Sequence, residues 1–375
     1  MQFKKYPFER LNELLDGVEP NSSYSPISLT IGEPQFETPK FIKEALANSL
    51  DLLNKYPKSS GEIELKEAQL GYLKRNFNVE LTLEQIIPTF GTREVLFNFP
   101  QFYLSSKDEP KMAFVNPFYQ IYEGASIASG ADVVYLNLEK ANGYKPVINK
   151  EKLEGVDIVI LNTPSNPTAS VMSLEEMKSW VKLALEMDFL LINDECYIEL
   201  YLDKPIPSLL NASVEVGNSE FKNVLVLNSI SKRSSAPGLR SGFIAGDRDI
   251  LKEYLRYRTY VGCAIPLPLQ KAAAVAWSDD KHVEPFREAY KENMLLAKDI
   301  LGVEIPEATF YIWIEVEDAI QKAKELYKEY NVKVLPGEFL GREGAGVNYW
   351  RIALVYDPKV TKEALERVAE FLEKY

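Results

Sequence analysis

Short apolar runs alternate with stretches of helical periodicity through most of the 375-residue chain, and this alternation restricts its fold more than any other feature. Continuous runs of branched and aliphatic side chains are typical of strands that are buried on both faces. Such runs lie at residues 112–115, 133–136, 158–161, 189–192 and 224–227, with helical patterns at 119–129 and 174–186. Because parallel strands need long crossover connections, the pattern predicts an α/β fold with a mostly parallel sheet between helices.

The C-terminal part of the chain carries a second and smaller α/β pattern. A long helix is expected from residue 284 to 300, followed by a strand, a helix, two strands and a final helix. We therefore expect an N-terminal arm at 1–35 that joins the small domain, a large domain at 36–284 and a small C-terminal domain at 285–375. A chain of this length can bury two such units.

The composition narrows the possible partners and location. With 43 Lys and Arg against 55 Asp and Glu, the net charge is −12, so nucleic acid and membrane are not expected partners. No apolar run approaches the roughly 18 residues of a membrane span, and no signal-peptide core is visible. The cysteines Cys196 and Cys263 cannot build a disulfide framework, and the single histidine, His282, is expected on the surface. We expect a cytoplasmic protein with small-molecule partners.

The segment at residues 228–246, NSISKRSSAPGLRSGFIAG, combines one lysine with hydroxyls and a second cation. Lys232 lies just past a predicted strand, where α/β proteins place their chemistry. Arg240 follows eight residues later, beyond a Pro-Gly turn. An amine and a fixed guanidinium in one polar turn indicate a site for an anionic group beside a reactive lysine. A solvated basic loop is the alternative interpretation.

Polar side chains follow three of the predicted strands. Asn166 comes after the run at 158–161, Asp194 and Tyr197 come after 189–192, and Lys232 comes after 224–227. Because the carboxyl ends of parallel strands lie at one edge of a sheet, we expect these four side chains to converge there.

Two glycine turns add to this predicted site. The sequence IIPTFGTREVLF indicates a strand, a turn at Gly91 and a helix, which places Thr92 and Arg93 at a helix N-terminus that favours phosphate. A turn at Gly32 brings the backbone close to a neighbour, since glycine permits close approach. An amine, a carboxylate, a phenol and an anion site together match the needs of pyridoxal 5′-phosphate.

The order of the motifs GTR, NPFY, PSNPT, DECY, SISKRSxxPGLRSG and WRIAL resembles that of the class I and II aminotransferases, pyridoxal-phosphate enzymes of fold type I. The resemblance covers nearly the whole chain. It implies a large domain with a mostly parallel seven-stranded sheet, a smaller α/β domain, and ping-pong transfer of an amino group between an amino acid and a 2-oxo acid. Within the family, the motifs are most similar to N-succinyldiaminopimelate aminotransferases of lysine and cell-wall biosynthesis, with 2-oxoglutarate as the expected acceptor.

The resemblance also assigns roles to individual residues. Lys232 resembles the Schiff-base lysine, which also acts as general base and acid, and Asp194 resembles the partner of the ring nitrogen. Asn166 and Tyr197 resemble the pair that binds the 3-oxygen, and Tyr119 the aromatic residue that stacks on the ring. The residues that would hold the phosphate are Gly91, Thr92, Arg93, Ser229 and Arg240.

Further roles concern the substrate and a second subunit. Arg351 would bind the substrate α-carboxylate, helped by Asn166 and by the backbone at Gly32. Tyr56 would reach the phosphate of the neighbouring subunit, which implies a homodimer with shared active sites. The family pattern continues NPT with glycine where this chain has Ala169, so this loop is expected to differ slightly.

Several alternatives stay open at this stage. Arg93, Arg233 and Lys58 are the cations that we would examine first for a distal substrate carboxylate, although Arg93 can also be read as a helix-surface residue. Cys196 lacks a histidine to activate it and is interpreted as a buried, inert thiol. Other possible functions are an aminotransferase specific for aspartate, alanine or aromatic amino acids, a carbon–sulfur β-lyase or decarboxylase, and a regulatory domain that binds the cofactor without turnover.

Overall fold

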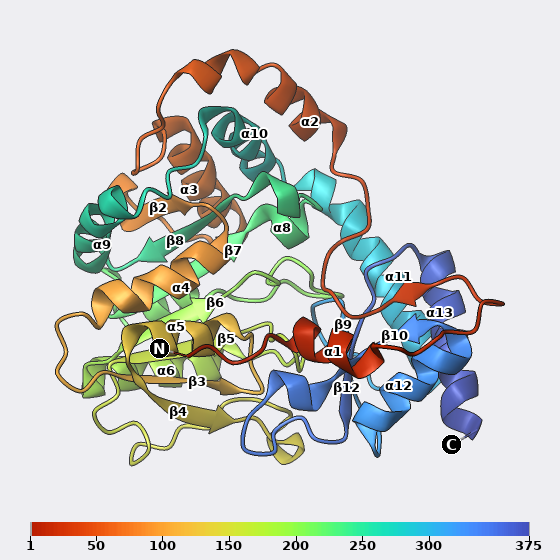
Figure 1. Ribbon diagram of the computed structural model, residues 1–375. Helices are drawn as coiled ribbons and strands as arrows, with labels where there is room; N and C mark the ends of the chain where they lie inside the picture. Colours follow the sequence, from red (N-terminus) through yellow and green to blue (C-terminus); the bar gives the residue numbers. More distant parts are fainter. Residues whose placement is uncertain (1, 375) are drawn as a thin grey trace.

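A seven-stranded sheet forms the centre of the larger lobe in the computed structural model, which describes residues 2–374 (Figure 1). The strand order is β2-β8-β7-β6-β5-β3-β4. The strands are β2 (Ile86–Thr89), β3 (Lys111–Asn116), β4 (Asp132–Asn137), β5 (Ile158–Asn162), β6 (Leu190–Asp194), β7 (Val224–Ser229) and β8 (Gly242–Gly246). Only β8 runs against its neighbours, β2 and β7. The predicted α/β fold with a mostly parallel sheet is therefore confirmed.

The central strands β5, β6 and β7 are buried along their whole length, and each begins with a run of aliphatic side chains, as expected for strands covered on both faces. Their backbone pairing extends beyond the apolar runs. Asn162 pairs with Asp194, so Asp194 is the last residue of β6 and not a loop residue. In the same way β7 ends at Ser229. These polar residues are thus held by the ladder of the sheet itself.

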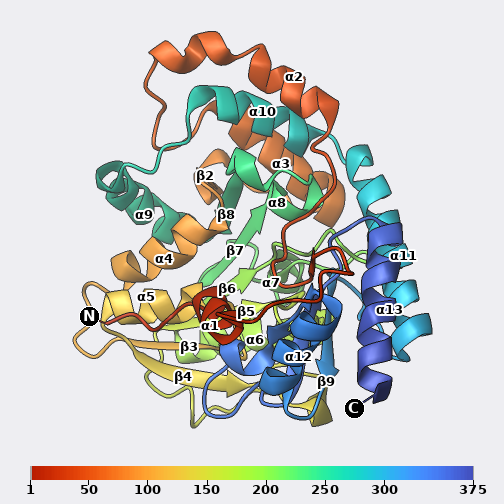
Figure 2. The same ribbon diagram turned by 45° about the vertical axis from the view of Figure 1, so that its right-hand side comes forward.

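Helices of the larger lobe surround this sheet. They are α2 (Lys40–Ala47), α3 (Ile63–Phe77), α4 (Thr92–Tyr103), α5 (Ile121–Ser129), α6 (Leu174–Met187), α7 (Leu209–Glu215), α8 (Ile230–Arg233), α9 (Arg248–Val261) and α10 (Leu267–Ser278). Short 3₁₀ helices are η1 (Leu50–Asn54), η2 (Leu83–Gln85), η3 (Lys140–Asn142), η4 (Pro237–Leu239) and η5 (Lys281–Val283). Figures 1 and 2 show α2 beside α10, which in turn packs against α3, at one end of the lobe.

Local sequence explains where several of these helices begin and end. At the start of α6, the Ser173 hydroxyl accepts a hydrogen bond from the Glu176 backbone amide, and the Glu176 carboxylate accepts one from the Ser173 amide. The helix ends at Asp188, which adopts a left-handed conformation. Residues 40–54 are divided into α2 and η1 at Asn48 and Ser49, residue types that compete with helix by local hydrogen bonding.

The smaller lobe combines the C-terminal part of the chain with the N-terminal arm. Its elements are α1 (Pro7–Leu15), β1 (Ile27–Ser28), α11 (Glu284–Leu301), β9 (Tyr311–Glu315), α12 (Ala319–Tyr330), β10 (Val332–Lys333), β11 (Leu335–Pro336), η6 (Gly337–Leu340), β12 (Tyr349–Ala353) and α13 (Pro358–Lys374). Strands β11, β12 and β9 form an antiparallel sheet, and β1 pairs with β10. Strands β10 and β11, although separated by only one residue, therefore belong to two different sheets. Helices α11 and α13 lie side by side (Figure 2).

Each lobe has its own hydrophobic core. The core of the larger lobe runs from Ile42 to Trp277 and includes Ala308. The second core joins Ile27 and Leu29 to residues 294–371. We keep the division into 1–35, 36–284 and 285–375 as a proposal, which the assignment of the arm to the second core supports.

The residue after Thr168, where the family pattern has glycine, is Ala169, and it adopts a positive φ of 58° in the loop after β5. This left-handed conformation costs a non-glycine residue roughly 1–2 kcal/mol. The alanine thus takes a backbone conformation that glycine adopts without cost.

Candidate active site

A cavity of about 920 Å³ lies at the carboxyl ends of the parallel strands, between the loops of the large sheet and the smaller lobe. Most of the predicted site residues line it: Gly32, Thr92, Arg93, Tyr119, Asn166, Asp194, Tyr197, Ser229, Lys232, Arg240 and Arg351. The convergence expected from the strand ends is therefore observed. Within residues 2–374, no helix has the length and hydropathy needed to cross a membrane, and no cluster of side chains suits a metal ion.

Lys232 lines this cavity and belongs to the one-turn helix α8, which follows β7 directly. The sequence predicts a loop here, but the Ser229 hydroxyl caps the turn by accepting a hydrogen bond from the Ser231 amide, at 3.0 Å. The Lys232 amine donates to the carbonyl oxygen of Gly32. Burial lowers the pKa of Lys232 from 10.5 to about 8. At neutral pH roughly a tenth of the amine is then uncharged and able to react with an aldehyde.

Asp194 is a buried carboxylate at the end of β6 that faces the cavity. Tyr122 donates its hydroxyl proton to Oδ2 at 2.9 Å, and the Cys196 amide donates to Oδ1 at 3.3 Å. Burial raises the pKa of Asp194, while the hydrogen bonds from Cys196 and Tyr122 oppose this effect. In the described part of the chain no cation forms an ion pair with Asp194. Its carboxylate is therefore available to a cationic atom of a ligand.

The predicted phosphate-binding residues meet at the start of α4. Gly91 precedes this helix with a φ of 74°, and a Cβ atom there would lie 2.3 Å from Nη2 of Arg240. Thr92 begins the helix, whose first amides lack intrahelical acceptors. Arg240 donates from Nη1 to the carbonyl oxygen of Pro237 at 2.8 Å. The hydroxyl groups of Ser229 and Ser231, 2.7 Å apart, complete this end of the cavity.

Arg351 reaches the cavity from β12 in the smaller lobe. Its Nη1 donates to Oδ1 of Asn166 at 2.7 Å, and its Nη2 donates to the carbonyl oxygen of Thr30. Its Nε is buried and has no hydrogen-bond partner among the described residues. A fixed guanidinium with a free donor suits the carboxylate of a substrate.

Arg93 lies at the exposed mouth of the same cavity. Its Nε donates to the hydroxyl of Tyr119 at 2.7 Å, and its Nη2 donates to the hydroxyl of Tyr6 at 2.9 Å. Tyr6 belongs to the N-terminal arm, which the sequence did not connect with the site. The guanidinium is thus held between two phenols, at a different place from Arg240.

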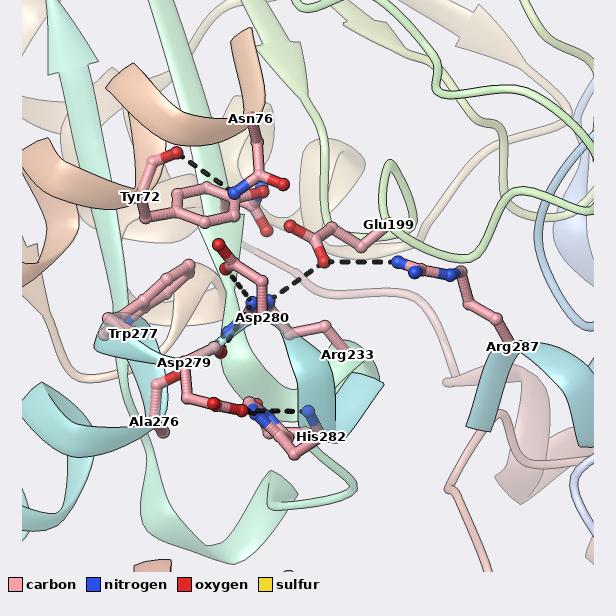
Figure 3. A network of polar contacts seen from close by, with 12 residues as sticks. Tyr72, Asn76, Glu199, Arg233, Ala276, Trp277, Asp279, Asp280, His282 and Arg287 are labelled. Atoms are coloured by element: carbon pink, nitrogen blue, oxygen red, sulfur yellow. Dashed lines mark hydrogen bonds and ion pairs between the residues drawn. The ribbon is translucent and has the colours of Figure 1, made fainter. Parts of the chain in front are cut away.

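Arg233 is not a cavity residue, although it follows Lys232 directly. Figure 3 shows its guanidinium inside the protein, between Glu199 and Asp280, with Tyr72 and Trp277 nearby. Arg233 Nε lies 3.3 Å from the Glu199 carboxylate, and Nη2 lies 2.9 Å from that of Asp280. These contacts leave Arg233 unavailable to a substrate, so it is excluded as the cation for a distal carboxylate.

The surface position expected for His282 is also wrong. Its side chain is only 6% exposed. Nε2 lies 2.8 Å from the Ser234 hydroxyl, and Nδ1 lies 2.8 Å from Asp279 (Figure 3). The charged sequence around His282 conceals this burial, because η5 packs back against the segment that follows Lys232.

Two predicted residues lie outside the cavity of their own chain. Tyr56 is fully exposed, and Lys58 is an exposed residue whose amine lies 3.5 Å from the Glu62 carboxylate. Two other residues lie in the site without having been predicted from the sequence. Tyr122 contacts Asp194, and Tyr311 places its hydroxyl 3.0 Å from that of Tyr197.

The arrangement fits pyridoxal 5′-phosphate on three observations. Among residues 2–374 no cation forms an ion pair with the buried Asp194 carboxylate, the Lys232 amine is partly uncharged near neutral pH, and Gly91 leaves room for Arg240 beside a helix N-terminus. Fold and site together define an enzyme of the fold-type-I class that uses this cofactor.

Comparison with known proteins identifies the family. A family model described as aminotransferase class I and II matches residues 24–372, and the chain belongs to this family. The solved structure of the aminotransferase AspB from Helicobacter pylori is 49% identical, covers all of both chains and has a TM-score of 0.98. An aminotransferase structure from Neisseria meningitidis is 38% identical, with a TM-score of 0.93, over 100% of this chain and 98% of that one. An LL-diaminopimelate aminotransferase of Natranaerobius thermophilus is 31% identical over 92% of this chain and 91% of its own.

Replacing Gly91 by alanine is expected to weaken cofactor binding. The new Cβ atom would displace Arg240, and the loss of a charge-assisted contact raises the dissociation constant of pyridoxal phosphate roughly 10- to 100-fold. Titration of cofactor-free protein, followed by fluorescence, measures this constant. Gly130→Ala is the matched control, because Gly130 has a similar φ of 67° with no atom within 4 Å of its Cβ position. Equal losses in both variants would contradict the role of the Gly91–Arg240 contact.

The pKa of Lys232 predicts how fast the protein captures its cofactor at different pH values. Only the uncharged amine reacts with an aldehyde, so the rate is expected to rise about tenfold per pH unit below pH 8 and to level off above it. Stopped-flow absorbance of pyridoxal phosphate added to cofactor-free protein measures the rate. Nα-acetyl-lysine under the same conditions corrects for ionisation of the cofactor itself. A corrected midpoint near the ordinary lysine value of 10.5 would show that Lys232 is not perturbed.

Proposed function

We propose that this aminotransferase takes N-succinyl-LL-diaminopimelate as amino donor and 2-oxoglutarate as acceptor, in lysine and cell-wall biosynthesis. The observation that carries the proposal is the Arg93 guanidinium, fixed by Tyr6 and Tyr119 at the mouth of a cavity that already contains a second cation for the α-carboxylate, Arg351. Both proposed substrates have a carboxylate distant from the reacting carbon. The motif resemblance described above gives further support.

One group of the site residues is proposed to hold the cofactor, and Lys232 is proposed to transfer the proton. Pyridoxal phosphate, when bound, supplies an aldehyde and a ring that stabilises negative charge at the substrate α-carbon. Lys232 would take the proton from that carbon and deliver it to the aldehyde carbon of the cofactor, and a pKa of about 8 suits both the uptake and the release of a proton near neutral pH. Asp194 holds the protonated ring nitrogen, Asn166 and Tyr197 hold the 3-oxygen, and Tyr119 stacks on the ring.

The remaining roles are those of binding. Gly91, Thr92, Ser229 and Arg240 hold the phosphate through the helix N-terminus, a hydroxyl and a guanidinium. Arg351 binds the α-carboxylate, with Gly32 and Asn166 beside it. We propose Arg93 as the cation for the distal carboxylate in preference to the phosphate, because its hydrogen bonds run to Tyr6 and Tyr119.

Specificity for aspartate, alanine or aromatic amino acids remains an alternative, and a comparison of amino donors distinguishes among them. Aspartate also carries a second carboxylate, whereas alanine and aromatic amino acids do not. The family match and the names of the relatives support transamination over the lyase, decarboxylase and regulatory alternatives.

Arg93→Met is expected to impair the binding of only those substrates that carry a distal carboxylate. A charge-assisted hydrogen bond contributes about 1.5–3 kcal/mol, so KM for N-succinyl-LL-diaminopimelate rises roughly 10- to 100-fold while that for alanine changes less than about twofold. The half-reaction with each donor alone, followed by the absorbance of the bound cofactor, provides the measurement. Lys58→Met serves as the control for loss of an exposed cation. Equal loss for all donors, or wild-type preference for alanine or phenylalanine, would contradict the proposed substrate.

The homodimer with shared sites is part of the same proposal. Leu50, Leu53 and Tyr56 form a short segment with exposed apolar side chains, and Tyr56 lies outside the cavity of its own chain. A second copy that covers this segment would explain both features.

Mixing two impaired variants is expected to restore activity if each site uses residues of both subunits. A dimer of one Lys232→Ala chain and one Tyr56→Ala chain contains one intact site out of two. Random exchange of subunits makes about half of the dimers mixed, so the mixture is expected to show about a quarter of wild-type activity. Activity is measured after unfolding and refolding the mixture, with each variant treated alone as a control. Size-exclusion chromatography showing only monomer, or no gain on mixing, would rule out shared sites.

A further inference from the structure

We propose that Tyr311 is a positioning residue of the active site, whose hydroxyl orients Tyr197 and whose ring supports Arg351. Neither the sequence motifs nor the family match assigns it a role. The inference rests on the proposed function, since Tyr197 and Arg351 act there on the cofactor and on the substrate. A residue of the smaller lobe would thus help to position side chains of the active site.

Tyr311 has a fixed place at the boundary of the two lobes. It is the first residue of β9 and pairs with Ala353 of β12, two residues beyond Arg351. Its backbone amide donates to the hydroxyl of Thr309 at 3.0 Å, and its side chain is 2% exposed. It also lines the cavity. The side chain is therefore buried everywhere except towards the site.

The hydroxyl groups of Tyr311 and Tyr197 lie 3.0 Å apart. Each phenol brings one proton, and the contact between them uses one of the two. The hydroxyl of Tyr311 packs closely against Gly32, whereas Tyr197 faces the cavity. When Tyr311 donates to Tyr197, the proton of Tyr197 is left for an oxygen atom of a ligand. We infer this direction of donation for the pair, because it is the one that the proposed role of Tyr197 requires.

The ring of Tyr311 contacts Arg351. The Cζ atom of Arg351 lies 4.5 Å from the ring centroid, and the arginine is only 4% exposed. Two of its nitrogen atoms are engaged by Asn166 and Thr30. A cation held over an aromatic face in a desolvated place is stabilised and oriented. The ring thus sets the plane in which Arg351 presents its remaining donor.

The place of the Tyr311 hydroxyl depends on a glycine at position 32. A Cβ atom at position 32 would lie 1.8 Å from the Tyr311 hydroxyl oxygen, so any other residue would displace Tyr311. The carbonyl oxygen of Gly32 accepts the hydrogen bond of Lys232. The close approach that the sequence predicts at Gly32 is therefore an approach to Tyr311. Three proposed site residues, Tyr197, Arg351 and Lys232, are linked to it directly or through Gly32.

Two substitutions separate the contributions of the hydroxyl and the ring. Tyr311→Phe removes only a hydrogen bond, so the dissociation constant of pyridoxal phosphate is expected to rise about 3- to 10-fold and the spectrum of the bound cofactor to shift, with KM for amino donors little changed. Tyr311→Leu also removes the ring, and KM is expected to rise roughly 5- to 30-fold. In a Tyr197→Phe background, Tyr311→Phe is expected to add less than about twofold, because its effect acts through Tyr197.

Tyr290→Phe is the matched control. Tyr290 is a buried tyrosine that also packs on Phe310, and its hydroxyl has no hydrogen-bond partner among residues 2–374. This variant is expected to match the wild type in cofactor affinity and KM. The proposed role of Tyr311 is wrong if Tyr311→Phe leaves cofactor affinity unchanged, as Tyr290→Phe is expected to do. It is also wrong if Tyr311→Phe weakens cofactor binding by the same factor in the Tyr197→Phe background as in the wild type.

The same set of variants tests the underlying assignments separately. If Tyr197→Phe leaves cofactor affinity unchanged and Arg351→Lys leaves donor KM unchanged, the proposed function of those residues fails, whatever Tyr311 does. If both variants are impaired and Tyr311→Phe is not, only the inference about Tyr311 fails. Thermal unfolding of each variant identifies any loss of fold, and the near-isosteric Tyr311→Phe carries the test if Tyr311→Leu does not fold.

Discussion

The side chain of Lys232 is half-buried in the cavity, and its neighbours along the chain hold it there. The strand β7 brings it to the edge of the sheet, and the Ser229 hydroxyl caps the turn that contains it. The next residue, Arg233, anchors that turn inside the protein by its ion pairs with Glu199 and Asp280 (Figure 3). Burial has a chemical consequence as well, since it lowers the pKa of Lys232 to about 8.

The cationic side chains around Lys232 suit ligands that carry both a phosphate and a carboxylate group. The chain as a whole has a net charge of −12, yet Arg93, Arg240 and Arg351 line this one cavity. The carboxylate of Glu94, which also lines the cavity, is neutralised by Arg258 at 2.7 Å. A concave site with such an excess of cations attracts phosphate and carboxylate groups even in an acidic protein. Asp194 remains as the carboxylate for the one cationic atom that the proposed cofactor carries.

The sequence predicted the sheet and the residues at its strand ends because both depend on local pattern. Asn166, Asp194 and Lys232 follow apolar runs whose burial is unambiguous, and parallel strands place such residues together. The position of Arg233 could not be read in this way. Successive residues of a helical turn point about 100° apart, so Lys232 enters the cavity while Arg233 enters the core. The contact of Tyr311 with Tyr197 depends on how the two lobes pack, which no local pattern encodes.

Lys232 is the residue that we propose to bind the cofactor covalently, and chemical trapping can identify the lysine that does so. Protein loaded with pyridoxal phosphate is reduced with borohydride, digested and analysed by mass spectrometry. We expect the reduced cofactor on the peptide that contains Lys232, attached to the amine of that residue. Attachment to a different lysine, or no attachment in a protein that has full activity, would contradict it.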